Sequence, residues 1–124
     1  MMKEKKDFKN IVYYDKDVDD IQIYNKDKED LVDRNFMFDD FIFSVTKDGK
    51  IVGLEIRSVS NFLREYGIDS SILLKIKGAK LKVIPKRDLI FIGVDFLVDE
   101  KNQVIEKRIP ITHLPIHKTL YLSS

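Results

Sequence analysis

Six basic residues between positions 75 and 87 are the side chains best placed to do chemistry, because they recur at short intervals. Alternate residues of an extended chain point to the same side, so lysines at every second position share one face of a strand. Leu81 and Val83 stand between lysines and predict an apolar face on the other side. The pattern predicts a cationic surface for an anion or an acidic partner, made by Lys75, Lys77, Lys80, Lys82, Lys86 and Arg87.

Three interpretations of this basic tract stay open from the sequence. Lysines guard sheet edges against aggregation, so the tract could serve solubility alone. It could also contact the acidic surface of another small protein or of a second copy of the chain. Finally, it could neutralise nucleic-acid phosphates, although the sequence pI of about 7.9 is modest and no aromatic residue alternates with the lysines.

His113 and His117 are spaced as two zinc ligands on one helical face would be. Pro115 lies between them and is incompatible with a helix interior. Two histidines also leave the tetrahedral coordination of zinc incomplete. We therefore expect exposed histidines here, and we predict no metal and no other cofactor.

No segment has the spacing of a catalytic motif. The serines lie outside G-x-S-x-G patterns, glycine-rich phosphate loops are missing, and the lack of cysteine excludes thiol nucleophiles and disulfides. Glu55 is the acid of most interest, because it lies between Leu54 and Ile56 on a predicted strand. It fits either a buried functional acid or the exposed face of that strand. We predict that the chain is not an enzyme and has no small-molecule substrate.

Size and composition predict one soluble domain. The 124 residues are 44% hydrophobic and 35% charged, which suits a single core with a charged surface. We expect a flexible charged N-terminus over residues 1–10, one domain over 11–112 and a C-terminal tail over 113–124. Neither a secretory signal nor an apolar run of membrane-spanning length is apparent, and cysteine is absent, so we expect a cytoplasmic protein that does not enter a membrane.

Charge is divided unevenly along the chain. Residues 1–40 hold twelve acids and eight bases, whereas residues 75–124 hold five acids and ten bases. Such a division is typical of a polyanion-binding face or of head-to-tail self-association, but it also occurs without function. The excess of lysine over arginine, with abundant isoleucine, is typical both of thermophile proteins and of AT-rich genomes.

The first half of the chain predicts two hairpins. Residues 11–14 and 21–24 flank an acidic turn, and residues 25–33 then read as a charged loop. Residues 41–45 and 51–56 flank an Asp-Gly turn, where glycine tolerates the positive φ that the turn requires. Four aromatic residues nearby are expected in the core, namely Phe36, Phe38, Phe41 and Phe43.

The second half predicts further strands. Residues 80–83 alternate lysine with apolar residues, and residues 89–98, apolar on both faces, are typical of a central strand. Residues 104–111 are expected to pair back as an edge strand, because Pro110 cannot donate a ladder hydrogen bond.

A short helix is predicted between the two halves. Ser58 or Ser60 can cap it, residues 61–66 carry its apolar face, and Gly67 can end it. Residues 69–77 fit either a second short helix or the start of a strand. The expected fold is therefore α+β, with an antiparallel β-meander of about six to seven strands and one or two short helices packed on one face.

Residues 13–66 resemble the YuzE-like family of small uncharacterised bacterial and archaeal proteins. The resemblance rests on Tyr14-Asp15 with Asp19, on Ile21-Gln22-Ile23, on residues 48–56 and on Ser60. It implies a small sheet with a helix laid against it, and a protein-binding role, but no activity. Residues 75–124 extend beyond the family pattern.

From these observations we expect a non-catalytic protein-interaction module. It would be a homo-oligomer that pairs through sheet edges or the helix face, or would bind another small protein. The alternative function is non-specific nucleic-acid binding by the lysine-rich hairpin.

Overall fold

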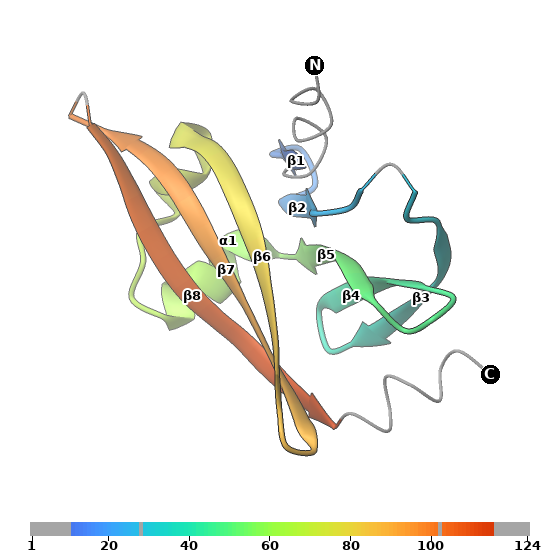
Figure 1. Ribbon diagram of the computed structural model, residues 1–124. Helices are drawn as coiled ribbons and strands as arrows, with labels where there is room; N and C mark the ends of the chain where they lie inside the picture. Colours follow the sequence, from blue (N-terminus) through green and yellow to red (C-terminus); the bar gives the residue numbers. More distant parts are fainter. Residues whose placement is uncertain (1–10, 28, 102, 116–124) are drawn as a thin grey trace.

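The computed structural model describes residues 11–27, 29–101 and 103–115, with only the backbone of residues 113–115. Two antiparallel sheets and two short helices make up this part of the chain (Figure 1). The first sheet holds β1 (Ile11–Asp15), β2 (Asp20–Tyr24), β3 (Val32–Phe38), β4 (Phe41–Thr46) and β5 (Ile51–Arg57). The helices follow, as α1 (Val59–Glu65) and the 3-10 helix η2 (Ser70–Lys75). The second sheet holds β6 (Ile76–Lys86), β7 (Leu89–Glu100) and β8 (Gln103–Pro115).

The antiparallel α+β class is confirmed, but the number and the order of the strands differ from the prediction. The described residues form eight strands in two sheets, because part of the expected charged loop forms the start of β3. The first sheet has the order β1-β2-β5-β4-β3, so β5 lies between β2 and β4 and the chain does not follow a simple meander. A local hairpin cue cannot reveal this arrangement, because β2 and β5 are far apart in the sequence.

Pairing between β2 and β5 forms the inner face of the first sheet. Ile21 lies opposite Ile56 and Ile23 opposite Leu54, and all four are buried. On β4, Phe43 continues the row beside Leu54. Because side chains alternate along a strand, this register also fixes which residues point to the opposite, outer face.

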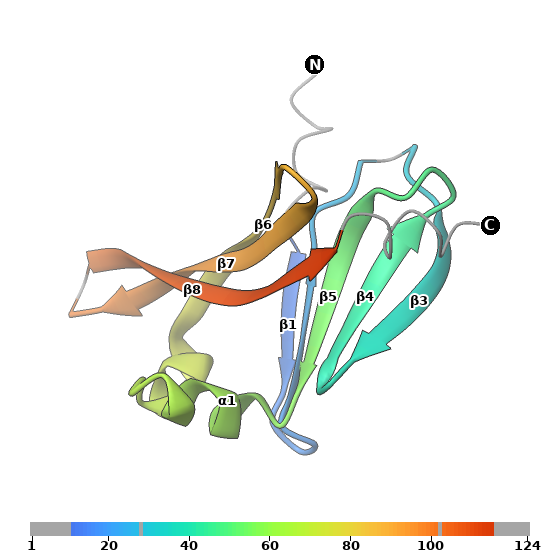
Figure 2. The same cartoon turned by 90° about the horizontal axis from the view of Figure 1, so that it is seen from below.

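The second sheet packs on this core. Its strand β6 contacts β1, β2 and β5, and Figure 2 shows β6–β8 crossing one side of the first sheet. Strand β7 is its centre, as predicted, and its buried residues Ile92, Val94 and Phe96 join the same core cluster as Ile21 and Leu54. Strand β8 is the predicted edge strand with Pro110.

Several local predictions are confirmed and two are corrected. Both predicted hairpins of the first half are present. The ambiguous segment forms η2 and then the start of β6. Phe38, expected in the core, is 39% exposed because it ends the edge strand β3. Strand β8 runs to Pro115, past the predicted domain limit, while residues 1–10 and 116–124 of the predicted termini lie outside the described residues.

The cap of α1 differs from the sequence prediction. Ser58 is the N-cap residue, but its side chain makes no capping hydrogen bond. Instead, the Asp19 carboxylate accepts hydrogen bonds from the Ser60 Oγ at 2.6 Å and from the Ser60 backbone N–H at 3.2 Å, although Asp19 precedes Ser60 by 41 residues. The Tyr14 hydroxyl donates to the same carboxylate at 3.1 Å, and the Asp19 carbonyl accepts from the Val59 N–H. The β1–β2 turn therefore holds the start of α1 in place.

We predict that Asp19→Ala lowers the free energy of unfolding by about 1–3 kcal/mol, because it removes the distant cap. Ser58→Ala is the matched control, since both residues have a positive φ, 57° and 53°, and only Asp19 makes side-chain hydrogen bonds to the helix. Ser58→Ala should change the stability by less than about 0.5 kcal/mol. Urea denaturation measures both, and equal losses would show that the Asp19 side chain is not the cap.

Candidate binding surfaces

The outer face of the first sheet is a continuous surface that crosses five strands. One row across it consists, in strand order, of Tyr13, Gln22, Glu55, Ile42 and Met37. The two ends of the row are open to solvent, with Tyr13 58% and Met37 57% exposed. The described part of the chain therefore leaves this face, with its aromatic and apolar side chains, available for contact.

Glu55 and Asp20 form a carboxyl pair on this outer face. Strand pairing places Asp20 opposite Arg57 and Glu55 opposite Gln22, so the two acids are diagonal neighbours on adjacent strands. The hydrogen bond with Asp20, burial and the negative charge of Asp20 raise the pKa of Glu55 to about 7, and the Arg57 cation opposes this only in part. Asp20 Oδ1 is buried and accepts no hydrogen bond from any other described group. A protonated Glu55 is therefore the donor that the Asp20 carboxylate requires.

Gly53 allows an aromatic ring to lie flat on the same face. A Cβ atom at position 53 would be 2.6 Å from Tyr24 Cε1 and 3.1 Å from the Ser44 Cβ. The ring of Tyr24 thus occupies the space that a side chain on β5 would fill. This packing adds the half-buried ring of Tyr24 to the exposed ring of Tyr13 on the outer face.

We predict that Glu55→Gln stabilises the protein above neutral pH. A carboxyl group whose folded pKa of about 7 exceeds its ordinary value of 4.5 opposes folding as pH rises through that interval, and the cost is complete above it. The amide still donates to Asp20 without ionising. The variant should match the parent near pH 4 and be more stable by about 1–3 kcal/mol near pH 8.

Urea denaturation at the two pH values measures this effect. Glu65→Gln, on the exposed side of α1, is the matched control and should lack the pH-dependent gain. A Glu55→Gln gain that is the same at both pH values would contradict the shared proton.

The predicted basic residues do not form one stripe. Lys80, Lys82 and Lys86 do alternate with Leu81 and Val83 along β6, as expected. Lys75, however, is the last residue of η2 and not part of an extended strand, because the ambiguous segment is helical. A register shift between residues 76 and 78 separates Lys77 from the regular part of β6, and Arg87 lies in the β6–β7 turn with φ 55°.

Two of the predicted cations are paired with acids. The Lys77 Nζ lies 3.8 Å from Asp99 Oδ2, and the Lys82 Nζ lies 3.8 Å from Asp95 Oδ2. Lys80, Lys86 and Arg87 are exposed and make no ion pair with a residue that the structure describes. Sequence reasoning missed these pairs because they depend on the register between β6 and β7.

Asp95 is a buried acid at the centre of the second sheet. Strand pairing places it between Lys80 and Arg108, and the Arg108 Nε donates to Asp95 Oδ1 at 2.9 Å. Burial acts to raise the pKa of Asp95, but the hydrogen bond and positive charge of Arg108, with contributions from Glu106 and Lys82, lower it. The negative charge of Asp95 therefore offsets part of the positive charge on the lysine-bearing face of the second sheet.

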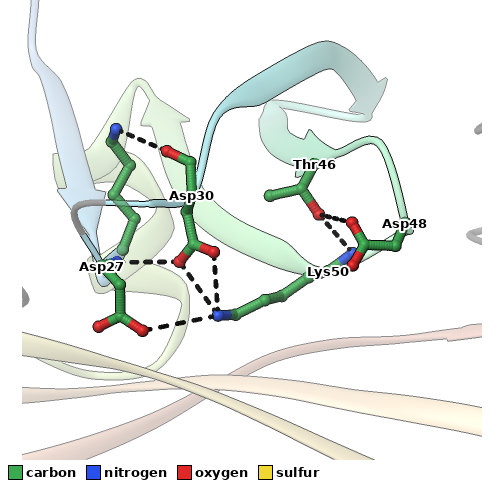
Figure 3. Close-up of polar contacts among 6 residues, drawn as sticks. Asp27, Asp30, Thr46, Asp48 and Lys50 are labelled. Carbon is green, nitrogen blue, oxygen red and sulfur yellow. Dashed lines mark hydrogen bonds and ion pairs between the residues drawn. The ribbon is translucent and has the colours of Figure 1, made fainter.

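A cluster of ion pairs fixes the loop before β3 (Figure 3). The Lys50 Nζ donates to Asp30 Oδ2 at 3.0 Å and to Oδ1 at 3.2 Å. The hydrogen bond from the Asp27 N–H, and then that from Lys50, lower the pKa of Asp30. The Thr46 hydroxyl accepts from the Lys50 N–H at 3.0 Å within the β4–β5 turn. These contacts join the entrance of β3 to the turn after β4.

The described residues offer little for catalysis. Ser60 Oγ is engaged by Asp19, and no group of three or more metal-ligating side chains is present in residues 11–27, 29–101 and 103–112. His113 belongs to β8 by its backbone, while its side chain and His117 lie outside the described residues. A hollow of about 440 Å³ beside α1 is lined by exposed acids and aromatic rings, among them Asp39, Glu65 and Tyr66, without any histidine or lysine.

No helix in the described part of the chain is long and apolar enough to cross a membrane. The chain matches no family model, no curated protein and no solved structure. The YuzE-like resemblance therefore stays a prediction. Three of the residues that carry the resemblance, Tyr14, Asp19 and Ser60, meet at the start of α1.

Proposed function

We propose that this protein is a non-catalytic protein-interaction module that acts as a homo-oligomer. The observation that carries the proposal is the open outer face of the first sheet. A row of five side chains crosses it, and its two ends, Tyr13 and Met37, are more than half exposed. Aromatic residues and methionine are enriched in protein interfaces, where they supply contact area.

The centre of this face carries less charge than its two acids suggest. A charged group is expensive to remove from water, so the proton shared by Glu55 and Asp20 leaves one negative charge in place of two for a partner to cover, opposite the Arg57 cation. With a pKa of about 7, Glu55 is largely protonated below neutral pH and hydrogen-bonded to Asp20. The flanking side chains Tyr24 and Ile42 are half-buried and add apolar contact area.

We predict that the purified protein forms a species of at least twice the 14.6 kDa mass of one chain. The reason is that its exposed apolar side chains lose contact with water on association. Light scattering on the eluate of a size-exclusion column, from low to high micromolar concentration, measures the mass. A monomer at every concentration would contradict the homo-oligomer.

Nucleic-acid binding is the second candidate function. Lys80 and Lys86, on one side of β6, and Arg87 in the adjoining turn are exposed cations without an ion pair to a described acid. Such cations release counterions from phosphates, and binding then falls as salt rises. The pairing of Lys82 with the buried Asp95 reduces the charge that this side can offer.

If this second function holds, Lys86→Glu with Arg87→Glu should weaken binding to every single strand and duplex by a similar factor and reduce the salt slope. Lys80 and Lys82 are left unchanged, because Lys80 lies opposite Asp95 and Lys82 pairs with it, so that a glutamate at either position would destabilise the sheet. Fluorescence anisotropy over a salt series measures the binding, with the exposed Lys47→Glu as control. Unchanged affinity in the double variant would exclude this surface.

A further inference from the structure

We propose that a second copy of this chain pairs with β3, so that two first sheets join edge to edge into one continuous sheet. This inference rests on the homo-oligomer of the proposed function: it takes a second copy as the partner and places the contact at one edge of the first sheet and not across its outer face. It requires that β3 be free, that its side chains favour contact, and that the other sheet edges be less suitable.

Strand β3 is a free edge in the described part of the chain. It pairs with β4 on one side only, and both views show it on the side of the first sheet away from β6–β8 (Figures 1 and 2). In an antiparallel ladder, alternate residues of an edge strand direct their N–H and C=O groups away from the sheet. A second extended strand satisfies these groups.

The side chains at this edge favour contact. Leu31, just before β3, and Val32, its first residue, are 76% and 41% exposed, and Met37 and Phe38, at its end, are 57% and 39% exposed. The only charged residues of the strand are Asp33 and Arg34, which form an ion pair at 2.6 Å. The strand itself therefore has no net charge, although the exposed Asp39 and Asp40 follow it in the β3–β4 turn.

The other described edges are less suitable. Strand β6 contacts β1, β2 and β5 and bears lysines and Pro85, while β8 contains Pro110. Proline, lysine and cover by another element protect sheet edges from pairing. Strand β1 has neither proline nor lysine and exposes Ile11 and Tyr13, but it contacts β6. Strand β3 also lacks proline and lysine, and it lies on the side of the first sheet away from β6–β8 (Figures 1 and 2).

A two-fold axis suits the pairing of two β3 strands. Identical strands related by this axis run antiparallel, so each supplies the same groups to the other and the assembly closes as a dimer. The register shift between Val32 and Arg34 limits regular pairing to Arg34–Phe38. The Lys50–Asp30 ion pair fixes the chain just before this segment. Loss of chain entropy on pairing is then small.

The test compares Met37→Lys with Tyr13→Lys by sedimentation velocity from low to high micromolar concentration. The two positions are equally exposed, lie in the same row of the outer face, and belong to opposite edges of the sheet. We expect the parent chain and Tyr13→Lys to be dimers, and Met37→Lys to raise the dissociation constant at least about tenfold. Far-ultraviolet circular dichroism shows whether each variant is folded.

Hydrogen exchange of the parent chain gives a second measurement that needs no variant. The amides of residues 34–38 that face away from β4 should exchange more slowly as the concentration rises. A dimer that survives Met37→Lys, or whose β3 amides show no concentration dependence, would overturn the β3 pairing and leave the proposed function standing. A dimer lost equally in Tyr13→Lys would place the contact on the outer face and also overturn it. A monomeric parent chain would overturn both proposals.

Discussion

The pairing of β2 with β5 is the constraint on which the rest of the structure depends. It places Ile21 opposite Ile56 and Ile23 opposite Leu54, and these residues form the floor of the core on which the second sheet packs. The same register ends at Asp20 and Arg57, so the preceding Asp19 reaches the start of α1. A slip of one residue would turn every side chain of β2 to the wrong face and would also break the cap.

The outer face is the other consequence of this register. Side chains on the two faces of a strand alternate, so burial of Ile21, Ile23 and Leu54 obliges Gln22 and Glu55 to meet on the opposite side. There Glu55 lies close enough to Asp20 for the two to be hydrogen-bonded through one proton. Such a pair opposes folding at alkaline pH, and proteins commonly retain destabilising groups where a surface has a function.

Charged side chains have different partners in the two sheets. In the second sheet, Asp95 is buried among its cationic neighbours Arg108 and Lys82, which lower its pKa. The negative charge of Asp95 in turn offsets part of their positive charge. In the first sheet, the acids Glu55 and Asp20 interact mainly with each other. The second sheet therefore presents less positive charge at its surface than the lysine and arginine content of the C-terminal half suggests. This favours the first sheet as the contact surface.

The sequence by itself determined the local elements of this protein. Its apolar alternation and turn residues predicted the β1–β2 and β4–β5 hairpins, the central β7 and the Pro110 edge, because short-range periodicity governs these features. It also drew attention to Glu55, but left open whether that acid was buried or exposed. Only the tertiary structure decided the insertion of β5 between β2 and β4, the Asp19 cap and the partners of Glu55 and Lys82. Each of these joins residues distant in sequence, and their contact depends on strand register, which no local pattern encodes.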